Sequence, residues 1–316
     1  MQSTQPIYLG ERIHLIDGFD MGWAERTGTY VIAEEELTLV ETGPSPSVPY
    51  IKAGLAQLGY TTEQVKYIIV THIHLDHAGG AGLFLKDCPN AKVVVHPKGA
   101  RHLIDPSRLI AGARAVYHDD FDRLFEPIEA VPEERILIRG DGDTLKIGEN
   151  CVLEFLDSPG HANHHFSIYD PVSQGMFTGD TAGVLYPQLK KEGIHLVLPS
   201  TSPNQFDPDA MQQSICRFED RHLRRIYFGH YGMTEQVEDA YRQIREWLPV
   251  FVAEGESALA AEQTYDELAS NLFSRVTDHL QSQGIGREHE VYEVLKLDLQ
   301  VCAMGILDYL HKRGQK

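Results

Sequence analysis

The sequence contains little cysteine: four residues among 316, far apart along the chain. No two of them form a C-x-x-C pair, so neither a disulfide framework nor a cysteine-rich metal site is indicated. None lies beside an obvious base in the sequence, so a cysteine nucleophile has little support. We interpret all four as reduced thiols of a cytoplasmic protein: Cys88, Cys151, Cys216 and Cys302.

Basic residues are also scarce, with 28 Lys and Arg against 46 Asp and Glu and a formal net charge of −18. Nucleic-acid binding needs clustered basic side chains that displace counterions, so this charge argues against a nuclease. Residues 1–10 lack an apolar core and a positive cluster, and no stretch approaches eighteen consecutive apolar residues. We therefore expect no signal peptide, no membrane span, and a small molecule as the substrate.

Strand and helix patterns alternate in the first half of the chain, which is typical of sheets covered by helices. Residues 98–132 interrupt this alternation and predict a helical insertion near the site. Helices are expected at residues 48–58 and 80–86. Strands are expected at residues 30–33, 37–40, 65–70, 93–95, 135–138, 152–156, 166–169, 176–178, 196–198 and 226–228.

The sequence is helical from residue 234 to its end, which predicts a main domain at residues 1–233 and a C-terminal helical region at 234–316 packed on it. Thr264 and Glu267 fit a capping box at the start of one of these helices. The last helix, at about residues 290–310, is apolar over a wide arc and must be buried. We interpret this as packing on its own domain, with a homodimer contact as the alternative.

Metal-capable side chains are concentrated in one string, His72-Ile73-His74-Leu75-Asp76-His77, directly after the apolar run at residues 67–70. Imidazole and carboxylate are the ligands that zinc and similar divalent metals accept. Three later segments repeat the pattern of an apolar run, a glycine and a metal-capable residue. Glycine allows the sharp turn that aims the next side chain, and a strand end holds it rigidly. The residues delivered in this way are His161 after Gly160, Asp180 after Gly179 and His230 after Gly229.

These motifs, in this order, resemble those of the metallo-β-lactamase-fold hydrolases, in particular their lactonase and glyoxalase II-like branch. The resemblance covers about residues 31–232. It implies an α/β fold, specifically a four-layer αββα sandwich with the site at one edge of the sheets. The helical insertion and the C-terminal helices would be additions to that sandwich.

The resemblance also implies how the ligands divide between two metal ions. His72, His74 and His161 would hold the first ion, and Asp76, His77 and His230 the second, with Asp180 bridging both. Two such ions share a water and lower its pKa from about 15.7 toward 7, which yields a bridging hydroxide as the nucleophile. Asp76 would orient it and pass a proton to the leaving group, as the catalytic residue. Zinc is the expected metal, with iron or manganese as alternatives.

Several positions depart from the family pattern. Glu41 stands where an aspartate is common, and we expect it to accept a hydrogen bond from a ligand imidazole. His165 is interpreted as structural, and so is His164, for which a position facing the pocket is the alternative. Asp180 occupies the place of a cysteine in the β-lactamases themselves, which argues against true lactamase activity. The other nine histidines lack this context, and of these His96 is the first to examine.

The function expected from these features is hydrolysis of a small ester or lactone, as in the N-acyl homoserine lactonases, with phosphotriesters as side substrates. The alternatives are a glutathione-thioester hydrolase and a mononuclear iron persulfide dioxygenase. The sequence does not identify the substrate-binding residues. Four aromatic residues could line a pocket, with core packing as the alternative for each: Phe19, Trp23, Tyr186 and Tyr231.

Overall fold

The structure is a computed structural model that describes residues 5–314. The chain forms two compact units, and each is described by itself. The first unit comprises residues 5–157, 164–179 and 222–235, and the second comprises residues 158–163, 180–221 and 236–314. The predicted boundary at residue 233 stays a prediction, and in the structure residues 180–221 group with the C-terminal helices.

The first unit contains two sheets, of which the larger has seven strands in the order β1-β2-β3-β4-β5-β6-β7. Pairing is antiparallel from β1 to β4 and parallel from β4 to β7. The sequence pattern did not reveal the first two strands. The seven are β1 (Ile7–Gly10), β2 (Ile13–Asp17), β3 (Gly28–Ile32), β4 (Leu37–Val40), β5 (Val65–Ile69), β6 (Lys92–Val95) and β7 (Ile136–Ile138).

The smaller sheet has six strands in the order β15-β14-β11-β10-β9-β8, and only β11 and β14 pair in parallel. Buried side chains from both sheets form one hydrophobic core, in which Tyr30 of β3 meets Phe177 and Tyr227 of the smaller sheet edge to face. The two sheets therefore face each other. The strands are β8 (Thr144–Gly148), β9 (Cys151–Asp157), β10 (Phe166–Asp170), β11 (Gly175–Gly179), β14 (Arg225–Phe228) and β15 (Met233–Thr234).

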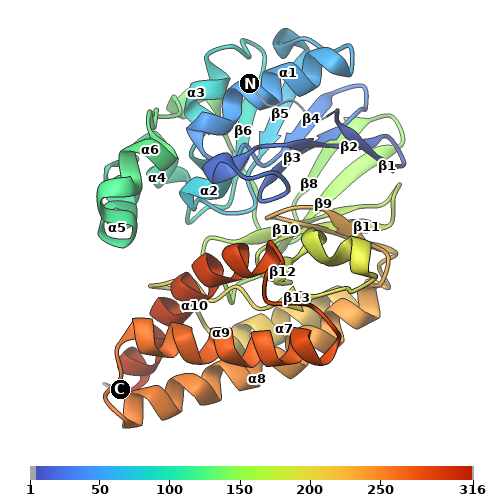
Figure 1. Cartoon of the computed structure of the whole chain (residues 1–316). Coiled ribbons are helices and arrows are strands. Elements are labelled where there is room, and N and C mark those ends of the chain that lie inside the picture. The colour runs from blue at the N-terminus through green and yellow to red at the C-terminus, as the bar shows by residue number, and fades with distance from the viewer. Residues whose placement is uncertain (1–4, 315–316) are drawn as a thin grey trace. The chain divides into compact units, whose positions relative to one another are not determined.

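Helices cover the outer face of the seven-stranded sheet (Figure 1). Ile51 and Leu55 of α1 (Val48–Gln57) and Phe84 of α3 (Ala81–Leu85) share a core with strand residues such as Ile68. The predicted insertion is helical: α4 (Ala100–Ile104), α5 (Ser107–Tyr117) and α6 (Phe121–Phe125). Another short helix, α2 (Leu75–Ala78), lies within the ligand string. Short 3-10 turns are η1 (Asp20–Gly22), η2 (Ser45–Ser47), η3 (Thr62–Gln64), η4 (His118–Asp120), η5 (Glu133–Arg135) and, in the second unit, η6 (Pro187–Glu192).

The second unit is mainly helical, with a small hairpin of β12 (Val184–Leu185) and β13 (Val197–Leu198). Its helices are α7 (Pro208–Glu219), α8 (Val237–Ala260), α9 (Tyr265–Ser282) and α10 (Val291–Gly314), and they share one core. The Asp207 carboxylate caps α7 by accepting from two backbone N–H groups, and the expected capping box of Thr264 and Glu267 is present at the start of α9. The predicted α/β fold with a helical insertion and a C-terminal helical extension is confirmed.

Among residues 5–314, no helix is both long enough and apolar enough to cross a lipid bilayer.

Candidate metal centre

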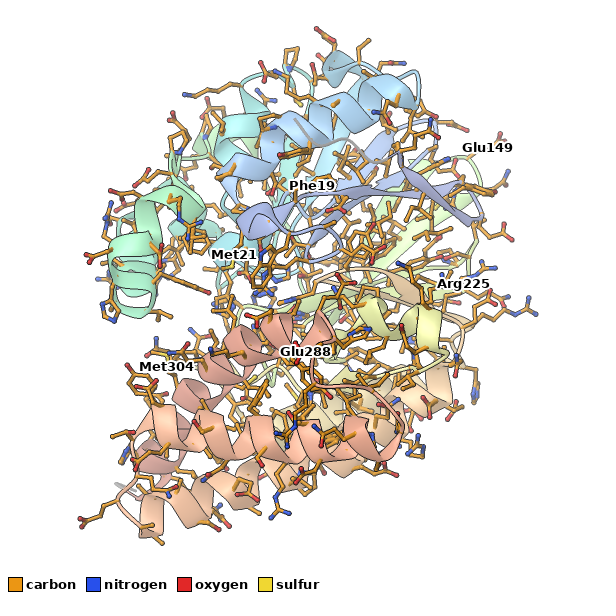
Figure 2. The ribbon with its side chains drawn as sticks, in the orientation of Figure 1. Phe19, Met21, Glu149, Arg225, Glu288 and Met304 are labelled. Carbon is orange, nitrogen blue, oxygen red and sulfur yellow. The ribbon has the colours of Figure 1, made fainter. Side chains whose placement is uncertain are left out.

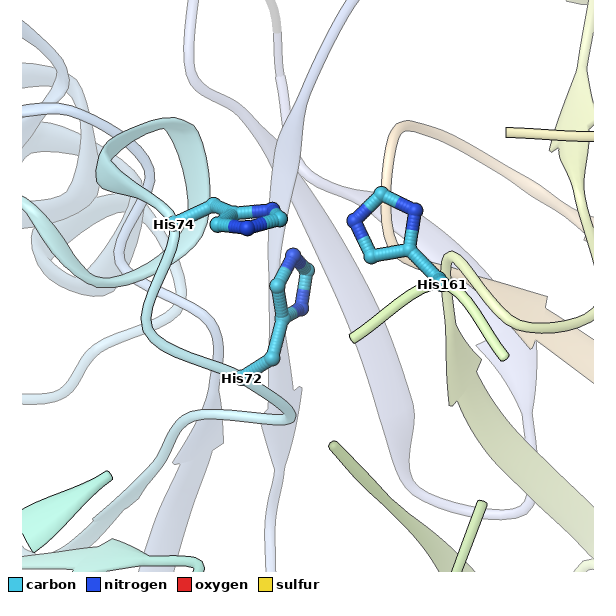
Figure 3. A group of neighbouring side chains, drawn as sticks. All are labelled: His72, His74 and His161. Carbon is cyan, nitrogen blue, oxygen red and sulfur yellow. The ribbon is translucent and has the colours of Figure 1, made fainter. Parts of the chain in front are cut away.

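Five of the seven predicted ligands belong to the first unit, and four of them follow β5. The strand leaves the seven-stranded sheet at Ile69, and the chain then places His72, His74, Asp76 and His77 around the start of α2. The ring of His72 lies 4.6 Å from that of His74 and 4.2 Å from that of His77, centroid to centroid. Figure 3 shows His72 and His74 with their rings edge to face. The string of metal-capable residues in the sequence is thus a cluster of side chains in space.

The fifth ligand, His230, comes from the loop after β14 and joins Asp76 and His77. The Asp76 Oδ2 atom lies 3.6 Å from His77 Nε2 and 3.8 Å from His230 Nε2. One ligand atom from each of the three residues lies within 4.8 Å of the others. Two imidazoles and a carboxylate at this spacing are a donor set that fits a divalent metal ion.

A buried carboxylate lies beside this group, as expected for Glu41. Its Oε2 atom is 3.6 Å from His77 Nδ1, on the side of the ring opposite Nε2. Its Oε1 atom accepts a hydrogen bond from the Thr71 backbone N–H at 3.1 Å, which ties Glu41 to the start of the ligand string. An acidic partner on the remote nitrogen orients a ligand imidazole and makes it a stronger donor to metal.

Two further histidines lie against the ligand rings. The ring of His165 stacks on His72 at 5.0 Å, and the ring of His164 meets His74 edge to face at 5.4 Å. Gly179 has a positive φ of 48°, and a Cβ at this position would overlap His165 Nε2. Both histidines are buried, and the stacking of His165 explains why a glycine precedes Asp180.

The helical insertion packs directly on the ligand string. Leu75, between His74 and Asp76, shares a hydrophobic cluster with Phe121, Leu124 and Phe125 of α6. Met21, labelled in Figure 2, packs against the same cluster from the loop between β2 and β3. The insertion therefore supports the backbone that carries two of the predicted ligands. From the sequence, this insertion was expected only to lie near the site.

That loop also carries a buried carboxylate that the sequence did not single out, Asp20. Its side chain is 2 % exposed, and Oδ2 lies 3.5 Å from Arg26 Nε. Burial raises the pKa of Asp20 from 3.8 to about 6, Arg26 opposes this shift, and the charge of Asp76 adds to it. The interaction with Asp76 places Asp20 in the electrostatic surroundings of the ligand group.

The second unit holds the remaining two ligands, His161 and Asp180. His161, also drawn in Figure 3, follows β9 in the chain, and Asp180 comes directly after β11. The His161 Nε2 atom lies 3.6 Å from Asp180 Oδ2. The Ser200 carbonyl oxygen is 3.0 Å from His161 Nδ1, and the Ser200 hydroxyl donates to Asp180 Oδ2 at 3.2 Å. Within the second unit, the two predicted ligands are thus adjacent and share one serine.

The other candidates have structural partners. His96 Nε2 lies 3.1 Å from Asp157 Oδ1, and burial lowers the pKa of His96 despite this carboxylate. Tyr231 packs in the core between the sheets, where burial raises its pKa. The Tyr186 hydroxyl donates to Asp298 Oδ2 at 3.1 Å in the second unit. Phe19 packs against the Tyr50 ring, whereas Trp23 is 37 % exposed on the same loop.

The four cysteines are free thiols, three buried and Cys216 exposed. Burial raises the pKa of Cys88 to about 12 and the pKa values of Cys151 and Cys302 to about 11. Thiols with such values stay protonated near neutral pH, so these three side chains are poor nucleophiles.

Comparisons with known proteins identify distant relatives of this chain. The chain is 26% identical over 226 residues to a metallo-beta-lactamase fold-containing protein of Sulfurisphaera tokodaii, a match that spans 70% of this chain and 79% of that relative. It is 24% identical to the N-acyl homoserine lactonase AttM of Agrobacterium fabrum, over 55% of this chain and 60% of the lactonase. The chain thus spans less than two thirds of that lactonase.

A solved structure shares the fold over nearly the whole chain. The metallo-beta-lactamase family protein from Thermus thermophilus is 21% identical, with a TM-score of 0.66, and the match covers 97% of this chain and 95% of that one. The family model of the metallo-beta-lactamase superfamily matches residues 24–230, from the loop before β3 to the predicted ligand His230. The chain belongs to the metallo-beta-lactamase superfamily.

Proposed function

We propose that the protein is a dinuclear metal-dependent hydrolase of small esters or lactones. The observation that carries the proposal is the group of Asp76, His77 and His230, whose ligand atoms lie within 4.8 Å of one another. This donor set suits zinc first, and iron or manganese next. The lactonases among the relatives support an ester or lactone bond as the target.

The resemblance of the sequence motifs supports a division of the ligands between two ions. His72, His74 and His161 would hold one ion, Asp76, His77 and His230 would hold the other, and Asp180 would be shared. Bound metal ions would activate a water at neutral pH and polarise the substrate carbonyl.

Asp76 is the proposed catalytic residue. Its carboxylate accepts a hydrogen bond from the attacking water and orients the water oxygen toward the carbonyl carbon. As the new carbon–oxygen bond forms, the bond to the leaving oxygen breaks, and Asp76 carries the proton from the water to that oxygen. The products are a carboxylic acid and an alcohol, joined in one molecule when the substrate is a lactone.

The charge of the protein supports an uncharged substrate. A net charge of −18 creates a potential that repels polyanions and leaves small neutral molecules unaffected. We therefore propose that the substrate is a small neutral molecule and that nucleic acids are not partners. We further propose that the enzyme is cytoplasmic and has no membrane partner.

Metal analysis combined with a substrate panel tests the proposal. Purified protein should contain two equivalents of divalent metal and should hydrolyse lactones or aryl esters faster than glutathione thioesters. Asp76→Ala and His161→Ala should each lose metal and activity, and full metal and activity in both would disprove the ligand assignment. A strong preference for glutathione thioesters, or iron content with oxygen uptake, would replace the proposed reaction by one of the two alternatives.

A further inference from the structure

The segment of residues 199–204 in the second unit lies between the ligand pair and helix α10. On one side, Ser200 contacts both ligands: its carbonyl oxygen lies 3.0 Å from His161 Nδ1, and its hydroxyl donates to Asp180 Oδ2 at 3.2 Å. A single residue therefore contacts both side chains. The neighbouring Ser202 hydroxyl lies 3.3 Å from His161 Nε2.

The contact with the carbonyl determines which nitrogen of His161 can bind a metal. A carbonyl oxygen only accepts hydrogen bonds, so His161 Nδ1 carries the proton and Nε2 keeps its lone pair. Nε2 is also the atom that lies 3.6 Å from Asp180 Oδ2. Ser200 thus presents the donor atoms of both ligands on one side, which is the role of a positioning residue.

On its other side, the same segment is attached to one face of α10. The Thr201 hydroxyl donates to the Cys302 carbonyl at 2.9 Å, and the Cys302 thiol lies 3.6 Å from the Pro199 carbonyl. One and a half turns further, the Asp308 carboxylate accepts from the Asn204 backbone N–H at 3.1 Å. The next turn adds Lys312, whose ammonium donates to the Asn204 carbonyl at 2.9 Å. Positions 302, 305, 308 and 312 fall on one face of a helix.

The helix approaches the backbone of the segment closely at Gly305. A Cβ at this position would overlap the Thr201 carbonyl oxygen and would lie 2.6 Å from the Ser202 carbonyl carbon. Both are backbone atoms, which cannot rotate away as a flexible side chain can. A methyl group at residue 305 would therefore push the segment of residues 199–204 away from α10.

We propose that α10 supports the metal centre. Its close backbone contact at Gly305 keeps Ser200 in position, and Ser200 aligns His161 and Asp180. The inference rests on the proposed function, because it assumes that these two residues bind metal. Its consequence is that metal affinity depends on a glycine that touches neither ligand.

Two variants of the full-length protein test this inference, Gly305→Ala and Ser200→Ala. The readouts are the zinc dissociation constant from competition with a chromophoric chelator and the visible absorption spectrum of the cobalt-substituted protein. Both variants should weaken zinc binding roughly 10- to 100-fold, the usual effect of removing a partner of a metal ligand. Ser200→Thr, which keeps the hydroxyl, should restore most of the affinity lost in Ser200→Ala.

Matched controls separate this effect from a general loss of stability. Gly314→Ala makes the same change on α10 at a position where, among the described residues, no atom outside the adjoining backbone lies within 4 Å of the added Cβ. Ser257→Ala removes a hydroxyl that donates to the Ala253 carbonyl of its own helix. Both controls should bind zinc within about twofold of wild type. Melting temperatures of the metal-free proteins, measured in parallel, show whether Gly305→Ala retains its fold, and Ser200→Ala gives the answer if it does not.

The outcomes distinguish this inference from the proposed function. If wild type binds two zinc ions and both variants keep its affinity, the role of α10 is wrong while the proposed function stands. A wild-type protein that binds no metal would overturn both.

Discussion

The two units hold their ligands in different ways. In the first unit the ligands brace one another: the His72 ring contacts the rings of His74, His77 and His165, and Glu41 lies beside His77. In the second unit, His161 and Asp180 share the support of Ser200, on a segment attached to one helix. Support in the first unit comes from many buried neighbours, so a substitution that lowers the stability of this unit should also weaken metal binding. In the second unit, a substitution should be able to lower stability without changing metal affinity.

The largest expected effect is that of Asp76→Ala in the first unit. Removing the group that orients the water and transfers the proton should lower kcat/KM roughly 10²- to 10⁴-fold on the best lactone or aryl ester. His96→Gln is a suitable control, because His96 is also a buried histidine at a strand end but pairs with Asp157. An Asp76→Ala protein with wild-type kcat/KM would remove Asp76 from the mechanism.

Leu75→Ala tests whether site and fold are coupled in the first unit. Leu75 is buried against α6, so the truncation should lower the free energy of unfolding by about 2–5 kcal/mol and weaken metal binding at the same time. Leu272→Ala makes the same change in the fully buried core of the second unit and should lower stability with unchanged metal affinity. Chemical denaturation and chelator competition measure the two quantities. Metal affinity that is equally unaffected in both variants would refute the coupling.

Asp20→Asn should change how stability depends on pH. Because burial raises the pKa of Asp20 from 3.8 to about 6, the folded protein keeps a proton that the unfolded chain loses in this range. Stability from this group is complete below pH 3.8, falls as pH rises to about 6, and is lost above that, a difference of about 3 kcal/mol by linkage. The metal-free Asp20→Asn protein should therefore be more stable than wild type at pH 7.5 and similar at pH 4, by thermal denaturation.

Asp170, also in the first unit, should change the pH dependence of stability in the opposite direction to Asp20. Burial opposes its ionisation, but hydrogen bonds from Arg12 and Ser173 lower its pKa, so its stabilisation is present above the unfolded pKa and is lost as pH falls through the folded one. Asp170→Asn should accordingly destabilise the protein at pH 7.5. The same sign of change in both variants would show that burial and pairing do not control these two carboxyls.

The smallest expected effect is that of Thr264→Ala, at the start of α9 in the second unit. Thr264→Ala removes the hydroxyl that accepts from the Glu267 backbone N–H and caps α9, which should cost about 0.5–2 kcal/mol. Metal content and kcat/KM should stay at wild-type values, because the cap touches neither α10 near Gly305 nor the segment of residues 199–204. A loss of zinc affinity in this variant would mean that any weakening of the helices disturbs the ligands.

Local patterns were sufficient to predict most of the fold. The apolar runs before His72, Asp180 and His230 are strands β5, β11 and β14, because a buried strand must be apolar and a turn needs glycine. The capping box at Thr264 depends on four consecutive residues and was also predictable. Strands β1 and β2 were not predicted, because β1 is an edge strand without a buried residue and β2 is a run of five residues that includes the polar His14 and Asp17.

The supporting residues of the site could not be predicted, because their contacts join distant parts of the chain. Ser200 lies 39 residues from His161 in the sequence, and nothing near it marks it as a partner of a ligand. Asp20 belongs to a loop without a motif, and its electrostatic surroundings are made by Arg26 of the same loop and by Asp76 of α2. Glu41 was predictable because it occupies a recognisable position in the family pattern.

The packing of Leu75 on α6 affects how freely the inserted helices can evolve. Phe121, Leu124 and Phe125 are buried in a cluster with Leu75, whereas α5 contributes only half-buried side chains to that cluster and exposes most of the rest of its surface. Random mutagenesis followed by selection on a new substrate should therefore accumulate changes in α5 and spare α6. The insertion would then combine a variable helix, in which new specificities can arise at little cost, with an anchored helix that keeps the ligand string in place.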